Sequence, residues 1–531
     1  MSVNKVMSMD EAIAMIKDGD TIWINAFLAL ANPKELGAAL TARFRESGYP
    51  QHLEVFCSAG FGDWTKDSAV EGYIVDGAVD RLVLGHFSSM PDTSEKIKKN
   101  EVEAYNLPLG VMSHMIRAAA SRKNSLRSKI GLNLYVDPRN GGSGMNQKSQ
   151  FEWAQLSYDE YEGEQLIYKV PKIDVALIKG SSVDRNGNIS FEDECVTVDA
   201  LSCAQAARAN GGKVIVQVAR KLDRHQRPRN VIIPGALVDA VVICHEQEQI
   251  IAVSGYNASL SGDVYVRENE MSTWASALEG NMTTRSKGRL PMHTLIARRA
   301  FRELKQGQIA NIGLGIPELV GTIAINEGML SKVTLSVESG ATGGLPASGR
   351  AFGATIGADS IVDMAQQFDF YDGGGLDICF IGALEVDAKG NVNGHISYDK
   401  LSGIGGFANI TQTSKTVVFC FTFSAKGLTV DTNNGVHILS EGSYPKIVQS
   451  VHSISFSARN ARENGQKVLY VTERCVFELT EAGLILTEIY KGVDLERDIL
   501  DRIPFSIAVS DDLKISDPMA ANLWAKNADL N

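Results

Sequence analysis

The chain repeats part of its own sequence, and this repeat constrains its fold more than any other feature. The segment DVALIKGSSVDRNGNIS at 174–190 parallels DICFIGALEVDAKGNVN at 377–393, with matched positions 203 residues apart (377 − 174 = 203). Each copy predicts a strand that leads into a D-x-x-G-N turn, where Asn and Gly supply the positive φ of the turn. A second pair of segments, 19–36 and 307–319, stands near the start of each copy. The sequence therefore predicts two related folding units. The matched positions are Asp174 and Asp377, Asp184 and Asp387, Gly187 and Gly390, and Asn188 and Asn391.

Short β-branched runs alternate with helical stretches in both copies, which is the pattern of an α/β fold with a largely parallel sheet. At 531 residues the chain is longer than one core normally serves. We expect two open α/β domains, 1–280 and 281–531, joined by the polar stretch 278–291. The expected strands are 52–56, 81–85, 174–180, 213–219, 239–244, 332–338, 376–382, 415–421 and 467–473, and the expected helices are 10–19, 32–48, 200–212 and 293–307.

Charge and hydropathy exclude several classes of protein. The formal net charge is −11, whereas a nucleic-acid-binding protein would show an excess of basic residues. The N-terminus lacks the charged and apolar regions of a secretory signal, and no run of about 18 apolar residues predicts a membrane span. We therefore expect a cytoplasmic protein with neither nucleic-acid nor membrane partners.

The segment KVTLSVESGATGGLPASG at 332–349 is the strongest candidate for chemistry. An apolar strand ends at Glu338 and enters a loop that holds several glycines, and ligands bind at the carboxyl ends of strands in such sheets. A carboxylate beside free backbone N–H groups is suited to act as a covalent nucleophile next to an oxyanion site. The same pattern also fits a structural glutamate whose oxygens accept from loop amides, so the residues alone leave both readings open.

Other glycine clusters, GLGIP at 313–317 and GIGGF at 403–407, either let the backbone approach a ligand or make tight turns. Neither is the G-x-G-x-x-G of a nicotinamide-dinucleotide site, and no phosphate-binding loop is present. The nine histidines show no metal-ligand spacing, so we expect no metal.

With the motif VESGATGG at 337–344 the chain resembles the family I coenzyme A (CoA) transferases, and it is most similar to the single-chain acetate, propionate and short-chain acyl-CoA type with fused α and β halves. The resemblance implies two domains of the NagB/RpiA-like fold, with the acyl side in the first and the catalytic glutamate and CoA site in the second. It extends over nearly the whole chain. The matching segments are 105–120, 136–142, 190–207, 337–344, 367–377, 389–393 and 403–407.

The resemblance implies a ping-pong reaction in which Glu338 attacks an acyl-CoA and becomes a glutamyl-CoA thioester, which then passes CoA to a second carboxylic acid. No cofactor is implied, because CoA is itself a substrate. The family also implies a homodimer or homotetramer. By the same resemblance Gly405 and Gly406 would donate N–H groups to the oxyanion, and Asn391 would orient the glutamate. The implied CoA-binding residues are Gly313, Leu314, Gly315, Ile316, Pro317 and Lys426.

The chain departs from the family at two places. Leu109 stands where many members have a glutamine that serves an oxyanion site, and NAFLALANP at 25–33 replaces a glycine-rich loop. Both changes make the acyl side more apolar, so we expect Asn25, Phe27 and Leu109 to line a pocket for a bulkier or more apolar group than acetyl. Two alternatives stay open: an acyl-CoA hydrolase, if the altered pocket admits water, and a non-catalytic binding or regulatory protein on the same fold.

Overall fold

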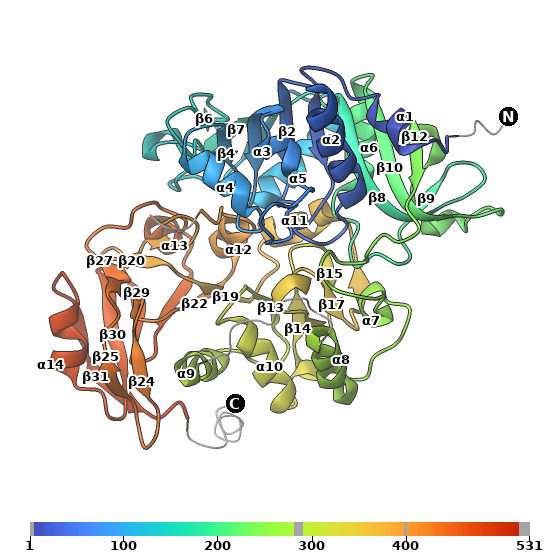
Figure 1. Cartoon of the computed structure of the whole chain (residues 1–531). Coiled ribbons are helices and arrows are strands. Elements are labelled where there is room, and N and C mark those ends of the chain that lie inside the picture. Colours follow the sequence, from blue (N-terminus) through green and yellow to red (C-terminus); the bar gives the residue numbers. More distant parts are fainter. Residues whose placement is uncertain (1–4, 281–289, 398–400, 520–531) are drawn as a thin grey trace.

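The computed structural model describes residues 5–280, 290–397 and 401–519. It contains two large mixed sheets, one in each half of the chain, and Figure 1 shows the first half above the second. Most neighbouring strands within the two sheets run parallel, which confirms the predicted α/β class.

The first sheet has a parallel core in the order β4-β3-β2-β1-β8-β10-β12. Alternate residues of the central strand β1 enter opposite cores: Trp23 packs beneath helices α5 and α6, whereas Ile22 and Ile24 pack beneath α1 to α4. A strand covered on both faces must be apolar throughout, which explains the continuous hydrophobic runs in the sequence. The bounds are β1 Thr21–Ile24, β2 Leu53–Cys57, β3 Val79–Leu84, β4 Glu103–Asn106, β8 Val175–Val183, β10 Lys213–Lys221, β12 Ala240–Ile243, α1 Met9–Ile13, α2 Lys34–Ser47, α3 Gly72–Val75, α4 Pro91–Lys98, α5 Leu109–Ala120 and α6 Ala200–Ala209.

The second sheet repeats this core in the parallel order β14-β13-β19-β22-β28. The matching order in the first half is β2-β1-β8-β10-β12, so the sequence repeat is also a repeat of topology. The second sheet then continues through antiparallel β29 and β30 to β31, which runs parallel to β30, and the sequence pattern did not predict this extension. The bounds are β13 Ile309–Ile312, β14 Thr334–Ser336, β19 Ile378–Gly382, β22 Thr416–Cys420, β28 Lys467–Val471, β29 Cys475–Thr480, β30 Gly483–Tyr490 and β31 Ala508–Ser516.

The two D-x-x-G-N turns are built alike. The Asn188 N–H donates to Asp184 Oδ1 at 3.0 Å, and the Asn391 N–H donates to Asp387 Oδ1 at 2.9 Å. Only the glycines, Gly187 at φ +80° and Gly390 at φ +88°, take the positive φ that we expected of both residue types. The asparagines instead close the turn by hydrogen bonding to the aspartate.

Helices from both halves pack together between the sheets, where α11 (Met364–Asp372) lies against α5 and α12 (Phe407–Thr413). Arg117 of α5 holds Asp369 of α11 with two hydrogen bonds of 2.7 and 2.9 Å. The hydrophobic core of the second half also takes in residues 27–31 from the first. The halves therefore share a continuous apolar interface.

The predicted domain boundary at 280 coincides with the end of helix α8 (Glu268–Gly280), and α9 (Pro291–Phe301) opens the second half. Most of the predicted linker, 281–289, lies outside the described residues. Met271 and Leu278 of α8 pack into the core of the second half, so this helix belongs by packing to the domain that follows it. The division into 1–280 and 281–531 stays a prediction. Among the residues that the structure describes, no helix is long and apolar enough to span a bilayer.

Candidate active site

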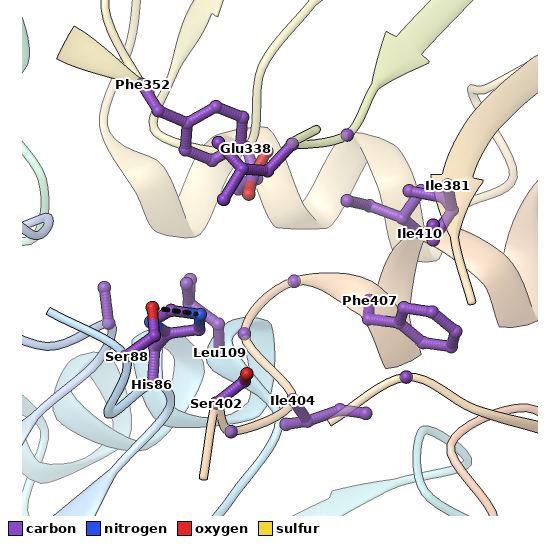
Figure 2. Close-up of a pocket in the computed structure, with 18 of the residues that line it drawn as sticks. His86, Ser88, Leu109, Glu338, Phe352, Ile381, Ser402, Ile404, Phe407 and Ile410 are labelled. Atoms are coloured by element: carbon purple, nitrogen blue, oxygen red, sulfur yellow. Dashed lines mark hydrogen bonds between the residues drawn. The ribbon is translucent and has the colours of Figure 1, made fainter. Parts of the chain in front are cut away.

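Glu338 lies at the tip of a tight turn that follows β14, two residues beyond the strand end. The Val337 N–H donates to Ala341 O at 3.0 Å and returns the chain antiparallel into β15 (Ala341–Thr342). Gly340 permits this turn: its φ is +121°, and a Cβ there would stand 2.1 Å from Val362 O. Gly340, two residues after the glutamate, therefore allows the chain to turn at Glu338, and Figure 2 shows the Glu338 side chain reaching into a cavity.

The cavity has a volume of about 260 Å³ and lies between the halves. In Figure 2 the first half presents His86, Ser88 and Leu109 opposite Glu338 of the second half. Most of the wall is apolar and aromatic. The first half contributes Phe27, Leu28, Ala59, Trp64, His86, Ser88 and Leu109, and the second contributes Asn311, Gly313, Leu314, Glu338, Phe352, 381–384, Gly394, 402–407 and Ile410.

The carboxyl group of Glu338 is held in a mostly apolar place, with 7 % of the residue exposed. Burial raises the pKa of Glu338 above its ordinary value, while its own backbone N–H and the Asn311 side chain oppose that rise. Asn311 comes from the middle of the apolar strand β13, and its Nδ2 also donates to Ser336 O at 3.1 Å. Sequence reasoning missed Asn311; the available signal was a single polar residue in the otherwise apolar strand IANI at 309–312.

The GIGGF loop at 403–407 brings a glycine against the glutamate. A Cβ on Gly406 would stand 3.2 Å from Glu338 Cγ, although the φ of −77° at Gly406 suits any residue. Glycine is therefore needed here for space rather than for backbone conformation. The Gly406 N–H has no hydrogen-bond partner among the described residues, so it is available to a ligand oxygen.

Gly405 corrects one expectation. Its N–H donates to Gly85 O at 2.8 Å, and its carbonyl accepts from the Leu109 N–H at 2.9 Å. Because both groups are used to join the halves, Gly405 cannot donate to an oxyanion in this conformation. Its role here is to hold the loop.

The other predicted site residues divide into two groups. Phe27, Leu109, Gly313 and Leu314 line the cavity as expected for residues beside a substrate. The expectation for Asn25 is wrong, because its amide is engaged with Thr197 O and the Asp199 N–H rather than with the cavity.

Asn391 and Lys426 also lie away from the cavity wall. The Asn391 side chain donates to Asp387 Oδ2 at 3.1 Å and accepts from the Ala458 N–H at 3.0 Å, so the structure does not bring it to Glu338. Lys426 is exposed, with its ammonium 5.9 Å from the centre of the Tyr444 ring. Gly315, Ile316 and Pro317 lead from the wall into helix α10 (Glu318–Asn326).

The loop at 25–33 keeps glycine-like geometry without glycine. Leu28 has φ +55° and Ala31 has φ +48°, and both are buried. A left-handed conformation costs a non-glycine residue roughly 1–2 kcal/mol, so the surrounding core must hold this loop in place. The result is that a leucine side chain lines the cavity where the family resemblance places glycine.

His86, Ser88, Phe352 and Trp64 also line the cavity and were not identified from the sequence. Ser88 Oγ lies 3.2 Å from His86 Nδ1, which places a polar pair on an otherwise apolar wall. Arg350 stacks over the Trp64 ring at 5.5 Å and ties the rim of one half to the other. No local motif marks these residues, since only the folded chain brings them together.

A family model described as coenzyme A transferase matches residues 6–243 and 293–497 of the chain. The chain belongs to the coenzyme A transferase family. It is therefore an enzyme of the CoA-transferase class, and the alternative of a non-catalytic binding or regulatory protein is set aside.

Individual CoA transferases match along nearly the whole chain. It is 36 % identical to the acetate CoA-transferase YdiF of Escherichia coli (strain K12) over 96 % of this chain and 94 % of that one. It is also 36 % identical to the caffeate CoA-transferase of Acetobacterium woodii over 97 % of this chain and 96 % of that one. A crystal structure of the E. coli O157:H7 acyl-CoA transferase YdiF, a thioester complex with CoA, matches with TM-score 0.88 and 34 % identity over 97 % of this chain and 95 % of that chain.

Proposed function

We propose that this CoA transferase moves CoA between an acyl-CoA and a carboxylic acid through a thioester on Glu338. The observation that carries the proposal is the position of Glu338: a buried carboxyl group at a turn tip, aimed into the cavity between the halves and beside Gly406. A relative of the same fold crystallised as a thioester complex with CoA supports the covalent route.

The proposed reaction has two mirrored halves. A Glu338 carboxylate oxygen attacks the thioester carbonyl carbon and the C–S bond breaks. The products are a mixed anhydride between Glu338 and the acyl group, and CoA as a free thiolate. The thiolate then attacks the glutamyl carbonyl carbon and releases the first acid as its carboxylate, so that CoA is joined to Glu338. A second carboxylate reverses these steps. The Gly406 N–H is the donor that we assign to the oxyanion, and the apolar wall keeps water from the anhydride.

The acyl group is proposed to lie against the first half of the chain. Phe27, Leu28 and Leu109 of that half and Phe352 of the other surround the space near Glu338 with hydrocarbon. Such a wall favours an acyl group that is bulkier or more apolar than acetyl. The related enzymes are named for acetate and for caffeate, so the same fold serves both a small and an aromatic acid.

An exchange assay tests the proposal. Purified protein is mixed with an acyl-CoA and a second carboxylic acid, and both the new acyl-CoA and free CoA are followed by chromatography. We expect the new acyl-CoA to form in equal amount to the acid released, with free CoA at background. Release of free CoA that does not depend on the second acid would indicate the hydrolase alternative instead.

Changing Leu109 to glutamine should shift the acyl preference. Leu109 is 2 % exposed and lines the cavity, and a buried amide without a partner costs about 1–3 kcal/mol. We expect the ratio of kcat/KM for hexanoyl-CoA to kcat/KM for acetyl-CoA to fall roughly tenfold. A tenfold change corresponds to about 1.4 kcal/mol of transition-state free energy. Leu107→Gln is the matched control, because Leu107 is equally buried but lies outside the cavity wall. An unchanged hexanoyl-to-acetyl ratio in Leu109→Gln would remove Leu109 from the acyl site.

The rate of the first half-reaction should depend on the ionisation of Glu338. Because burial raises the pKa of Glu338, the reactive carboxylate is lost at a higher pH than the ordinary value of 4.5 would suggest. We expect kcat/KM for acyl-CoA to fall as pH falls through that raised pKa and to be constant well above it. Circular dichroism at each pH separates this effect from unfolding. A profile that stays flat down to pH 4.5 would contradict the assignment.

The predicted absence of a cofactor, the homodimer or homotetramer, and the cytoplasmic location remain proposals. Light scattering of the purified protein measures the assembly directly. Full exchange activity after dialysis against a chelator is the expected result for a site that needs no metal.

A further inference from the structure

The loop that carries Gly406 is held in place by the opposite half of the chain. Its backbone groups at Ser402, Ile404 and Gly405 all bond to the first half. The Ser402 carbonyl accepts from the Phe87 N–H at 2.7 Å, and the Gly405 N–H donates to Gly85 O at 2.8 Å. The position of Gly406 beside Glu338 is therefore set from across the cavity.

Asn106 lies at the end of β4, and its side-chain amide bonds both to the first half and to this loop. It has no exposed surface. Its Nδ2 donates to Leu84 O and to Gly85 O, both at 2.8 Å. Its Oδ1 accepts from the Ile404 N–H at 2.8 Å. One amide therefore joins Gly85, which receives the Gly405 N–H, to Ile404 of the same loop.

Tyr135 fixes the orientation of that amide. Its hydroxyl donates to Asn106 O at 3.0 Å and lies 3.2 Å from Asn106 Oδ1. The Tyr135 ring also packs on His395 with centroids 4.3 Å apart, and His395 O accepts from both the Ser402 and the Gly403 N–H groups. Asn106 and Tyr135 thus hold the loop from both ends.

We propose that Asn106 is a positioning residue for catalysis: it sets the loop at 402–406 so that the Gly406 N–H faces the reacting carbonyl at Glu338. Asn106 does not line the cavity, so it acts only through the loop. The inference rests on the proposed function, since it assigns the oxyanion donor to Gly406. Four polar contacts satisfy this buried amide, and two of them hold the backbone segments that meet at Gly405.

The test is a double-mutant cycle between Asn106→Leu and Gly406→Ala, measured as kcat for acyl-CoA exchange. A misplacement of about 1 Å by a change away from the chemistry can lower the rate about 100-fold, so we expect Asn106→Leu to reduce kcat by that order while KM stays near the parent value. If Asn106 acts through Gly406, adding Asn106→Leu to Gly406→Ala lowers kcat little further. Independent effects that multiply in the double variant would overturn the inference.

Two further variants keep the test decisive if Asn106→Leu folds poorly. Asn106→Asp keeps an acceptor for the Ile404 N–H but cannot donate to Leu84 O and Gly85 O, and Tyr135→Phe removes one hydroxyl only. Both variants should lower kcat, and Tyr135→Phe should lower it less than Asn106→Asp. When either is combined with Gly406→Ala, kcat should again fall little below that of Gly406→Ala alone. Wild-type kcat in both would overturn the proposal.

Asn146 supplies the matched control. Its Nδ2 also donates to two backbone carbonyls, Ile97 O at 2.9 Å and Val102 O at 2.8 Å, but it touches neither the loop nor the cavity. We expect Asn146→Leu to change stability and to leave kcat near wild type. Failure of the proposed function is seen separately, as exchange that survives Glu338→Gln. The cycle, by contrast, reports only whether Asn106 and Gly406 act together.

Discussion

Replacing Glu338 by glutamine is expected to lower acyl-CoA exchange by roughly 10⁴-fold or more, the order of loss seen when a covalent nucleophile is removed. Glutamine keeps the size of the side chain and its contacts with Gly406, but an amide cannot form the anhydride. The effect should appear in kcat, with binding of acyl-CoA retained. Glu338→Ala should lose exchange equally and cannot regain a carboxyl group by deamidation.

Stability separates this loss of activity from loss of the fold. A glutamate whose folded pKa is raised favours folding below its unfolded pKa and loses that contribution as pH rises through the folded pKa. At pH values above that raised pKa the ionised, buried carboxylate therefore opposes folding, and Glu338→Gln should there unfold at an equal or higher temperature than wild type. Glu385→Gln is the control, because Glu385 is also buried but lies outside the cavity wall. Substantial exchange in folded Glu338→Gln would refute the covalent role.

The second large effect is expected for Gly406→Ala. The added methyl group would stand 3.2 Å from both Glu338 Cγ and Ile410 Cδ1, so the carboxyl group or the loop must shift. Alanine keeps the backbone N–H, but a shifted loop would move it away from the oxyanion, and loss of one oxyanion donor typically lowers the rate 10²–10³-fold, about 2.7–4 kcal/mol. We expect a fall of this order in kcat, measured with saturating acyl-CoA and acid.

Gly280→Ala is the control for the added methyl group, since a Cβ at Gly280 meets no described atom within 4 Å. It should leave exchange unchanged. A Gly406→Ala variant with wild-type kcat would show that the space beside Glu338 is not critical and that the loop can carry a methyl group without misplacing the Gly406 N–H.

Much of the fold follows from the sequence because its signals are local. The recurring D-x-x-G-N turns and the apolar runs place β8 and β19 correctly, and the same parallel neighbours then follow in both halves. The strands β29 to β31 were missed: β29 and β30 pair antiparallel, and β31 pairs parallel with β30. The pairing of β29 with β30 depends on a partner across a hairpin rather than on a continuous apolar run, since one face of β30 is only half-buried.

The candidate site was less predictable, because it forms where the halves meet. Glu338 and Gly406 carry local signals: a carboxylate at a strand end and a glycine-rich loop. His86 and Asn106 carry none, and they reach the site only when β3 and β4 of the first half pack against the loop of the second. Gly405 shows the same limit, since its N–H is occupied by a carbonyl more than 300 residues earlier in the chain, Gly85 O.

The most direct test of a Glu338–CoA thioester is mass spectrometry of the intact protein and its peptides after brief mixing with acyl-CoA and no acceptor acid. The account predicts that the peptide holding Glu338 gains the mass of CoA less one water, that the gain disappears when a carboxylic acid is added, and that Glu338→Gln never shows it. An unmodified Glu338 peptide in protein that is actively exchanging CoA would contradict the account.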